Sequence, residues 1–127
     1  MPFPRPKKRH LDDYRALLRV DVDFGSGGMW EIPEPCCRQA GTCISYESIG
    51  LPTWLIARFD YWTSWYDAHR PWQNTPGLDG ELFRAYALSL AVDVKRVLGD
   101  DYYIEYAGRE IHDDRQFLRD THERDIA

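Results

Sequence analysis

The sequence has few cysteines and no long apolar run, and each shortage excludes a class of protein. Three cysteines among 127 residues are too few for a disulfide-rich scaffold. Because the number is odd and the neighbours Cys36 and Cys37 cannot easily bond to each other, we expect reduced thiols and a cytoplasmic protein. No apolar run approaches the roughly 20 residues that cross a bilayer, so we expect no membrane partner. The basic start lacks a following apolar segment and cleavage site, and we expect no signal peptide.

Motifs for catalysis and metal binding are also missing. The sequence contains no G-x-S-x-G elbow, and the glycine-rich stretch at 25–28 lacks the lysine of a phosphate-binding loop. The spacing C-C-x5-C differs from the paired C-x2-C units of zinc sites. Segments 112–114 and 122–125 combine histidines with acids, but no apolar wall beside them would exclude water. We therefore expect no enzyme activity, no cofactor and no metal.

The net charge of −5 is unevenly distributed along the chain. The first ten residues hold four bases and no acid, which leaves 12 bases and 21 acids for the rest. An acidic body favours a basic protein partner and argues against nucleic acid, although acidity that serves only solubility fits equally well. From these shifts we predict a flexible basic arm (1–10), a single domain (11–111) and a charged C-terminal tail (112–127).

Alternating apolar and polar residues predict short strands at both ends of the domain. Residues 14–24 end in clear alternation of apolar and polar residues, which is the period of a half-buried strand. The apolar side of this strand carries Leu18, Val20 and Val22. A glycine-rich turn leads to 29–32, which predicts a second strand and a hairpin. Further strands are expected within 43–49 and 100–108.

Residues 53–69 predict an aromatic helix, because nothing within them breaks a helix and Pro52 suits its first turn. Four apolar residues follow one another at spacings of four, three and four, so they share one buried face. These residues are Leu55, Phe59, Trp62 and Tyr66. A neighbouring stripe of the same helix contains Trp54, Arg58, Tyr61 and Trp65.

Residues 79–98 predict a second helix, with Asp79 near its start and Gly99 at the left-handed cap position after its end. The order strand, strand, helix, helix, strand is typical of an α+β fold. We expect a small, mostly antiparallel sheet with the two main helices packed on one face. The aromatic helix would lie between the sheet and the second helix.

The helices and the strands around them resemble a family of small bacterial immunity-type proteins. The shared pattern is a leucine or proline before a helix, a tryptophan and "YD" near its end, a second helix of the form "LA..LK..LG", and a closing strand. The matching residues are Leu51, Trp62, Tyr66, Asp67, Leu90, Ala91, Val94, Lys95, Leu98, Gly99 and Tyr106. The resemblance covers roughly 18–106, whereas the cysteine-rich loop, the basic arm and the charged C-terminus depart from the pattern. It implies a small acidic protein that binds a secreted bacterial toxin.

Three functions fit these observations. The first is an immunity protein that binds and neutralises a cognate toxin by protein–protein interaction. Its partner-facing residues would be acids and exposed tryptophans, which are enriched in interface hot spots: Asp60, Trp65, Asp67, Trp72 and Asp79. The alternatives are a small ligand-binding or enzymatic domain with a pocket between the aromatic helix and the sheet, and an adaptor that uses its terminal arms.

Overall fold

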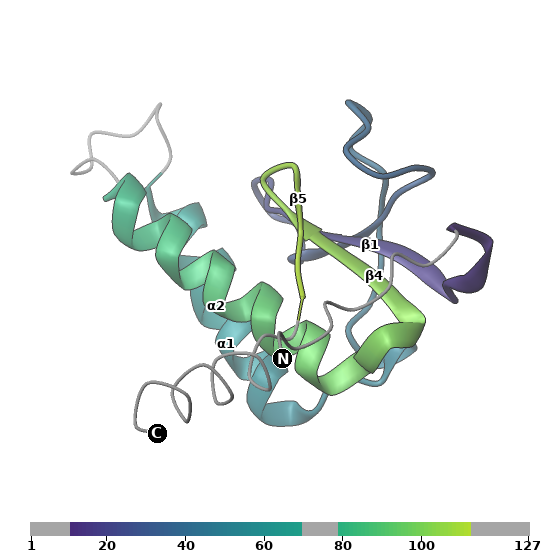
Figure 1. Ribbon diagram of the computed structural model, residues 1–127. Helices are drawn as coiled ribbons and strands as arrows, with labels where there is room; N and C mark the ends of the chain where they lie inside the picture. The colour runs from purple at the N-terminus through teal and green to yellow at the C-terminus, as the bar shows by residue number, and fades with distance from the viewer. Residues whose placement is uncertain (1–10, 70–78, 113–127) are drawn as a thin grey trace, which may run out of the picture.

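The computed structural model describes residues 11–69 and 79–112, which form a five-stranded sheet with two α-helices on one face (Figure 1). The elements of this part of the chain are η1 (Leu11–Asp13), β1 (Ala16–Val20), β2 (Met29–Glu31), β3 (Thr42–Cys43), η2 (Glu47–Ile49), α1 (Thr53–Ala68), α2 (Gly80–Leu98), η3 (Gly99–Asp101), β4 (Tyr102–Tyr106) and β5 (Arg109–Glu110). The predicted basic arm, Trp72 and residues 113–127 of the predicted tail lie outside the described residues.

The sheet has the order β3-β2-β1-β4-β5, so the first strand of the chain lies at its centre. β1 pairs antiparallel with β2, as the predicted hairpin requires, and parallel with β4 on its other side. β3 and β5 add short antiparallel edges. The predicted α+β fold with a mostly antiparallel sheet is therefore confirmed. The parallel pair arises because both helices fall in the connection before β4, and this crossover returns the chain in its original direction.

Both helices begin and end within one residue of their predicted bounds. The Asp79 carboxylate caps α2 by accepting a hydrogen bond from the Leu82 amide at 3.1 Å. The same helix ends at Gly99, whose φ of 77° is the conformation that favours glycine. α1 follows the extended residue Pro52, which suits the first turn of a helix because it lacks an amide donor.

The core lies between the helices and one face of the sheet. Leu18 and Ile104 contribute fully buried side chains from the two central strands. Phe59 and Trp62 contribute the largest buried side chains of α1, and Trp62 stacks on Phe83 of α2 with ring centroids 4.9 Å apart. The spacing that predicts a buried face for α1 is thus confirmed for its central residues.

The helix that packs most closely on the sheet is α2, not α1. α2 contacts β4 and β1, whereas α1 chiefly contacts α2 (Figure 1). The prediction that the aromatic helix lies between the sheet and the second helix is therefore wrong. Ala87 and Ala91 on the buried face of α2 allow its close approach to the strands. α1 reaches the hairpin at Gly28, where an added Cβ would lie 2.6 Å from Phe59.

The two edge strands differ from expectation. β3 covers only Thr42–Cys43, and the 3-10 helix η2 occupies the later part of 43–49. β5 is missed by the sequence patterns, because the charges of Arg109–Glu110 resemble a solvated tail. It forms because Ala107 and Gly108 both have positive φ, 52° and 77°, which gives the two-residue turn of a tight hairpin.

Candidate functional site

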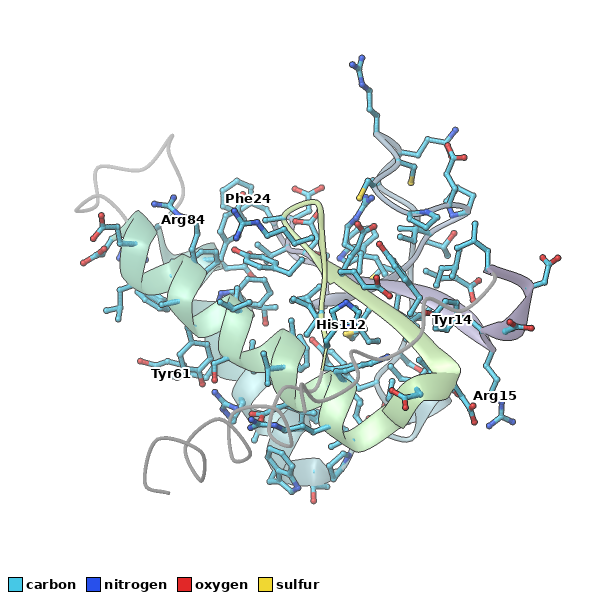
Figure 2. All side chains as sticks on the ribbon, viewed as in Figure 1. Tyr14, Arg15, Phe24, Tyr61, Arg84 and His112 are labelled. Atoms are coloured by element: carbon cyan, nitrogen blue, oxygen red, sulfur yellow. The ribbon has the colours of Figure 1, made fainter. Side chains whose placement is uncertain are left out.

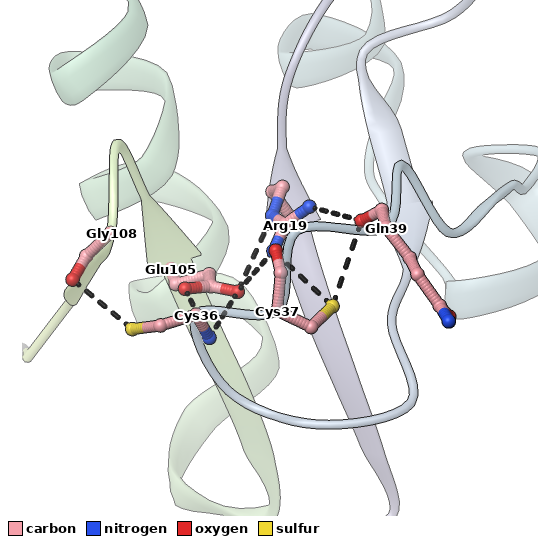
Figure 3. Close-up of polar contacts among 6 residues, drawn as sticks. All are labelled: Arg19, Cys36, Cys37, Gln39, Glu105 and Gly108. Carbon is pink, nitrogen blue, oxygen red and sulfur yellow. Dashed lines mark hydrogen bonds and ion pairs between the residues drawn. The ribbon is translucent and has the colours of Figure 1, made fainter.

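The sheet face that the helices leave open carries a buried ion pair. Arg19 and Glu105 are direct partners in the parallel pairing of β1 with β4. Each alternates with apolar neighbours that face the helices, so both side chains lie on the opposite face. Arg19 Nη2 lies 3.1 Å from Glu105 Oε1, and the Glu105 side chain is fully buried (Figure 3). A buried carboxylate is tolerated only where charge and hydrogen bonds replace its lost hydration.

Residues 33–41, which we call the cysteine loop, cover this ion pair. The Cys36 amide donates hydrogen bonds to both oxygens of the buried carboxylate at 3.2 and 3.1 Å. The guanidinium donates to the carbonyl oxygens of Gln39 and Cys37 at 2.8 and 2.7 Å (Figure 3). Cys36 also has a φ of 56°, which is uncommon for residues other than glycine. The ion pair therefore fastens a strained loop to the sheet.

The Cys36 thiol does not have the surroundings of an activated nucleophile. Its Sγ donates to the Gly108 carbonyl oxygen at 3.2 Å. Hydrogen bonding with the Glu105 carboxylate raises the pKa of this thiol, and lost hydration and the negative charge of the same carboxylate raise it further. Because the thiolate is the reactive species, a raised pKa opposes nucleophilic chemistry at neutral pH. The cluster in Figure 3 is suited to holding the cysteine loop.

Two hollows stand out in the part of the chain that the structure describes. The larger, of about 710 Å³, lies where the start of β1 meets residues 39–42, and Arg15 and Glu31 are among the residues that line it. The smaller, of about 340 Å³, lies beside Arg19 and the cysteine loop. Neither hollow lies between the aromatic helix and the sheet, where buried core side chains fill the space.

An acidic flank runs along the side of α1 that faces the turn between β1 and β2. It consists of Asp21, Asp23, Glu47, Asp60 and Asp67. The Gly25 amide of the turn donates to the Asp67 carboxylate at 3.0 Å, and Phe24 stacks on Tyr66 with ring centroids 4.5 Å apart. Lost hydration raises the pKa of Tyr66, and the charges of Asp23, Asp21 and Asp67 raise it further. Three carboxylates therefore lie close enough to this ring to affect its ionisation.

Tyr46 lies at the other end of the acidic flank. Its hydroxyl accepts a hydrogen bond from the Gly28 amide at 2.9 Å. Burial raises the pKa of Tyr46 to about 12; the hydrogen bond from the Gly28 amide opposes this change, and the charges of Asp60 and Glu47 add to it. Because Asp60 and Asp67 are seven residues apart, they lie on the same side of α1.

A second exposed surface, which we call the aromatic seam, lies on the helix pair away from the acidic flank. It consists of Trp54, Tyr61, Trp65, Leu82 and Tyr86. The Tyr61 ring lies near a ring from each helix, with its centroid 6.4 Å from that of Trp65 on α1 and 5.6 Å from that of Tyr86 on α2. Figure 2 shows Tyr61 extending outward from the helices. Trp65 is half-buried, whereas Trp54 and Tyr61 are 53% and 63% exposed.

The predicted partner-binding residues do not form one surface. Asp60 and Asp67 lie together on the acidic flank, whereas Trp65 lies in the aromatic seam across the helix. Asp79 is exposed at the start of α2, where its carboxylate caps the helix. Trp72 lies outside the described residues.

Sequence reasoning missed several members of these two surfaces. The alternation in the first strand places Asp21 and Asp23 on its solvent side. This signal could have identified them as surface acids, like Asp60 and Asp67 of α1. Trp54 and Tyr61 belong to the recognised second stripe of the aromatic helix. Their exposure depends on where α2 stops covering that stripe, which helical spacing does not determine.

A scan against protein-family models gives no match, and a search of the curated proteins gives none either. Within residues 11–69 and 79–112, no helix has the length and apolar character needed to span a membrane.

Proposed function

We propose that this chain is an immunity protein of the bacterial cytoplasm, which binds a cognate toxin and neutralises it without catalysis. The observation that carries the proposal is the acidic flank, where carboxylates from the hairpin and from α1 gather around two tyrosine rings. The resemblance of the sequence to immunity-type proteins supports the same role.

The acidic flank has the chemistry to recognise a basic protein surface. Its negative potential would steer a lysine- or arginine-rich partner and raise the association rate. The stacked rings of Phe24 and Tyr66 supply apolar area beside the charges, and tyrosine is common among residues that dominate interface energy. A toxin whose active site is basic would lose access to its substrate when this surface covers it.

The open face of the sheet favours binding over catalysis. Arg19 and Glu105 are engaged with each other and with the cysteine loop, so their charges serve the fold. The raised pKa keeps the Cys36 thiol protonated at neutral pH. These three polar side chains are thus engaged in structural contacts.

Co-expression with candidate toxins tests the proposed function. The full chain should co-purify with the product of a neighbouring toxin gene and should restore growth of cells that produce it. The double variant Asp21→Asn/Asp23→Asn should weaken rescue, while Asp12→Asn, which removes an exposed carboxylate from η1, should not. Failure to rescue growth from every adjacent toxin candidate would sink the proposal.

The larger hollow favours a second candidate function, the binding of a small ligand. Its volume of about 710 Å³ lies within the range of ligand sites, and Arg15 and Glu31 supply both signs of charge. A thermal-shift screen with nucleotides and small metabolites separates the two candidates. A rise of several degrees with one compound would support this function, because a ligand that binds only the native state stabilises it.

A further inference from the structure

The aromatic seam is the outer edge of the ring packing between the two helices. Its members Trp65 and Tyr86 pack against the core, while the inward-facing Phe59 and Trp62 of α1 are at most 1% exposed. Trp54, Tyr61 and Leu82 nevertheless remain 53%, 63% and 59% exposed. Large apolar side chains that are grouped and exposed on a surface mark an interaction site more often than scattered ones do.

The charge of the seam distinguishes it from the rest of this acidic chain. Among the described residues of α1 and α2, Asp93 is the carboxylate nearest the middle of the seam by helical spacing, and the exposed Asp60 and Glu81 lie at its edges, one turn from Ser64 and Ala85. Asp93 forms an ion pair with Arg58 and lies 3.7 Å from Arg96. A basic partner would find the carboxylate in the middle of the seam already paired, and it is better matched by the acidic flank. Two copies of a chain with a net charge of −5 can meet at the middle of the seam without opposing unpaired carboxylates.

Most of the residues beside the aromatic rings are small and neutral: Ala57, Ser64, Ala68, Ala85 and Ser89, all of them exposed. The exception is Arg58, which lies 5.2 Å from the centroid of the Tyr86 ring and is engaged in its ion pair with Asp93. Small side chains let helix axes approach to the lower end of the usual packing distance of about 8–10 Å. Larger or charged residues at these positions would hold a second helix pair away from the rings.

The exposed area fits a small homodimer interface. A large aromatic side chain buries about 150–250 Å² when it is fully covered. The seam and its small neighbours therefore offer on the order of 600 Å² per copy, which is close to the roughly 800 Å² per partner of a standard interface. An area at the lower end of the standard range is typical of weak, reversible association.

From these observations we infer that the aromatic seam is the docking face for a second copy of this chain. The α1–α2 pair of one copy packs on the α1–α2 pair of the other about a two-fold axis, which gives a four-helix arrangement. The sheets and the acidic flanks then lie on the outside. The acidic flanks stay accessible, so one dimer presents two partner-binding surfaces.

Sedimentation velocity of the full chain, from about 1 to 200 µM, tests the inference over the range in which a micromolar dimer would dissociate. The unaltered chain should shift from monomer to dimer. Tyr61→Glu and Leu82→Glu should each remain monomeric throughout, because dimerisation would bury an unpaired carboxylate. Circular dichroism melts should show that both variants fold, since the replaced side chains are more than half exposed.

Leu88→Glu is the matched control, because Leu88 is 48% exposed on the other side of α2. This variant, and Asp21→Asn/Asp23→Asn on the acidic flank, should dimerise like the unaltered chain. A monomer at every concentration would overturn the inference. The seam would then have another occupant, either a different part of the chain or a different protein. Equal loss of dimer in Leu88→Glu and Tyr61→Glu would overturn it as well.

Discussion

Arg19 and Glu105 face each other across the only parallel strand pair among the described residues, with a nitrogen–oxygen distance of 3.1 Å beneath the cysteine loop. The pair joins strands that are 86 positions apart in sequence and supplies the contacts that fasten the loop. It therefore ties the first strand, the last long strand and an irregular segment into one unit. Its removal should affect stability well beyond the two residues.

Replacing Glu105 by alanine should lower the free energy of unfolding by about 3 kcal/mol, because it leaves a largely buried guanidinium without its partner. Urea denaturation followed by circular dichroism measures the change. Glu34→Ala, an exposed residue of the same loop, should change stability by no more than about 0.5 kcal/mol. Similar losses in both variants would contradict a structural role for the ion pair.

Replacing Gly28 by alanine should destabilise the protein by about 1–3 kcal/mol, the usual range for overpacking a close contact. The new Cβ would lie 2.6 Å from the Phe59 ring, which is itself fully buried and has little room to move. Gly27→Ala is the comparison, because its Cβ would meet its nearest neighbour at 3.4 Å. Thermal denaturation should rank Gly28→Ala well below Gly27→Ala, and the reverse order would show that the hairpin is free to shift.

Stability should fall with rising pH above about pH 10, because the pKa of Tyr46 is about 12 in the folded protein. In the unfolded chain this phenol ionises near pH 10, so the folded state holds more protons between pH 10 and 12. Stability then decreases as pH rises through that window. Tyr46→Phe should show a shallower loss when urea midpoints are compared between pH 9 and pH 11. An unchanged slope would assign the alkaline loss to other groups.

The Cys36 thiol should react slowly with iodoacetamide at neutral pH, because its raised pKa lowers the fraction of thiolate. Mass spectrometry of peptides after timed alkylation gives the rate at this residue. Glu105→Gln removes the charge that favours the protonated thiol and should accelerate alkylation by several-fold. Fast alkylation of the unaltered protein at pH 7 would reopen the question of a reactive cysteine.

Toxin association should depend on salt and on the acidic flank. For a partner identified by rescue, Asp21→Asn/Asp23→Asn should reduce the association rate by about 3- to 10-fold at low salt and alter the dissociation rate little. Raising the salt concentration should shrink the difference, since it screens charges on the surface. Stopped-flow or surface-plasmon measurements would check both effects. If the variant instead dissociates faster and associates at an unchanged rate, these acids make close contacts with the toxin and do not steer its approach.

The sequence carries enough periodic information to define the main elements. Spacings of three and four place both helices, and alternation places β1 and β4, because each pattern records a face that must be buried. The positions of Asp79 and Gly99 also predict how α2 begins and ends, since a cap is a local event. Local signals of this kind transfer from sequence to structure with little dependence on the rest of the chain.

The contacts that build the candidate site depend on segments far apart in sequence. Nothing near Arg19 indicates that its strand will lie beside Glu105, and nothing in the cysteine loop indicates that its amide will bind that carboxylate. Which helix covers the sheet is also a packing outcome, decided by the small side chains of α2. For the same reason helical spacing identifies Trp65 as partly outward but does not rank it below Trp54 or Tyr61 in exposure.

The central position of β1 has a consequence for the newborn chain on the ribosome. β1 emerges first but lacks its parallel neighbour until β4 has left the exit tunnel, by which time both helices are already synthesised. The hairpin and the aromatic rings of α1 must therefore wait in a partly assembled state, with apolar surface open to chaperones and to other chains. Pairings between such distant segments also slow folding. Because of this strand order, the chain reaches its fold when β4 is synthesised and pairs with β1, and not when the early hairpin forms.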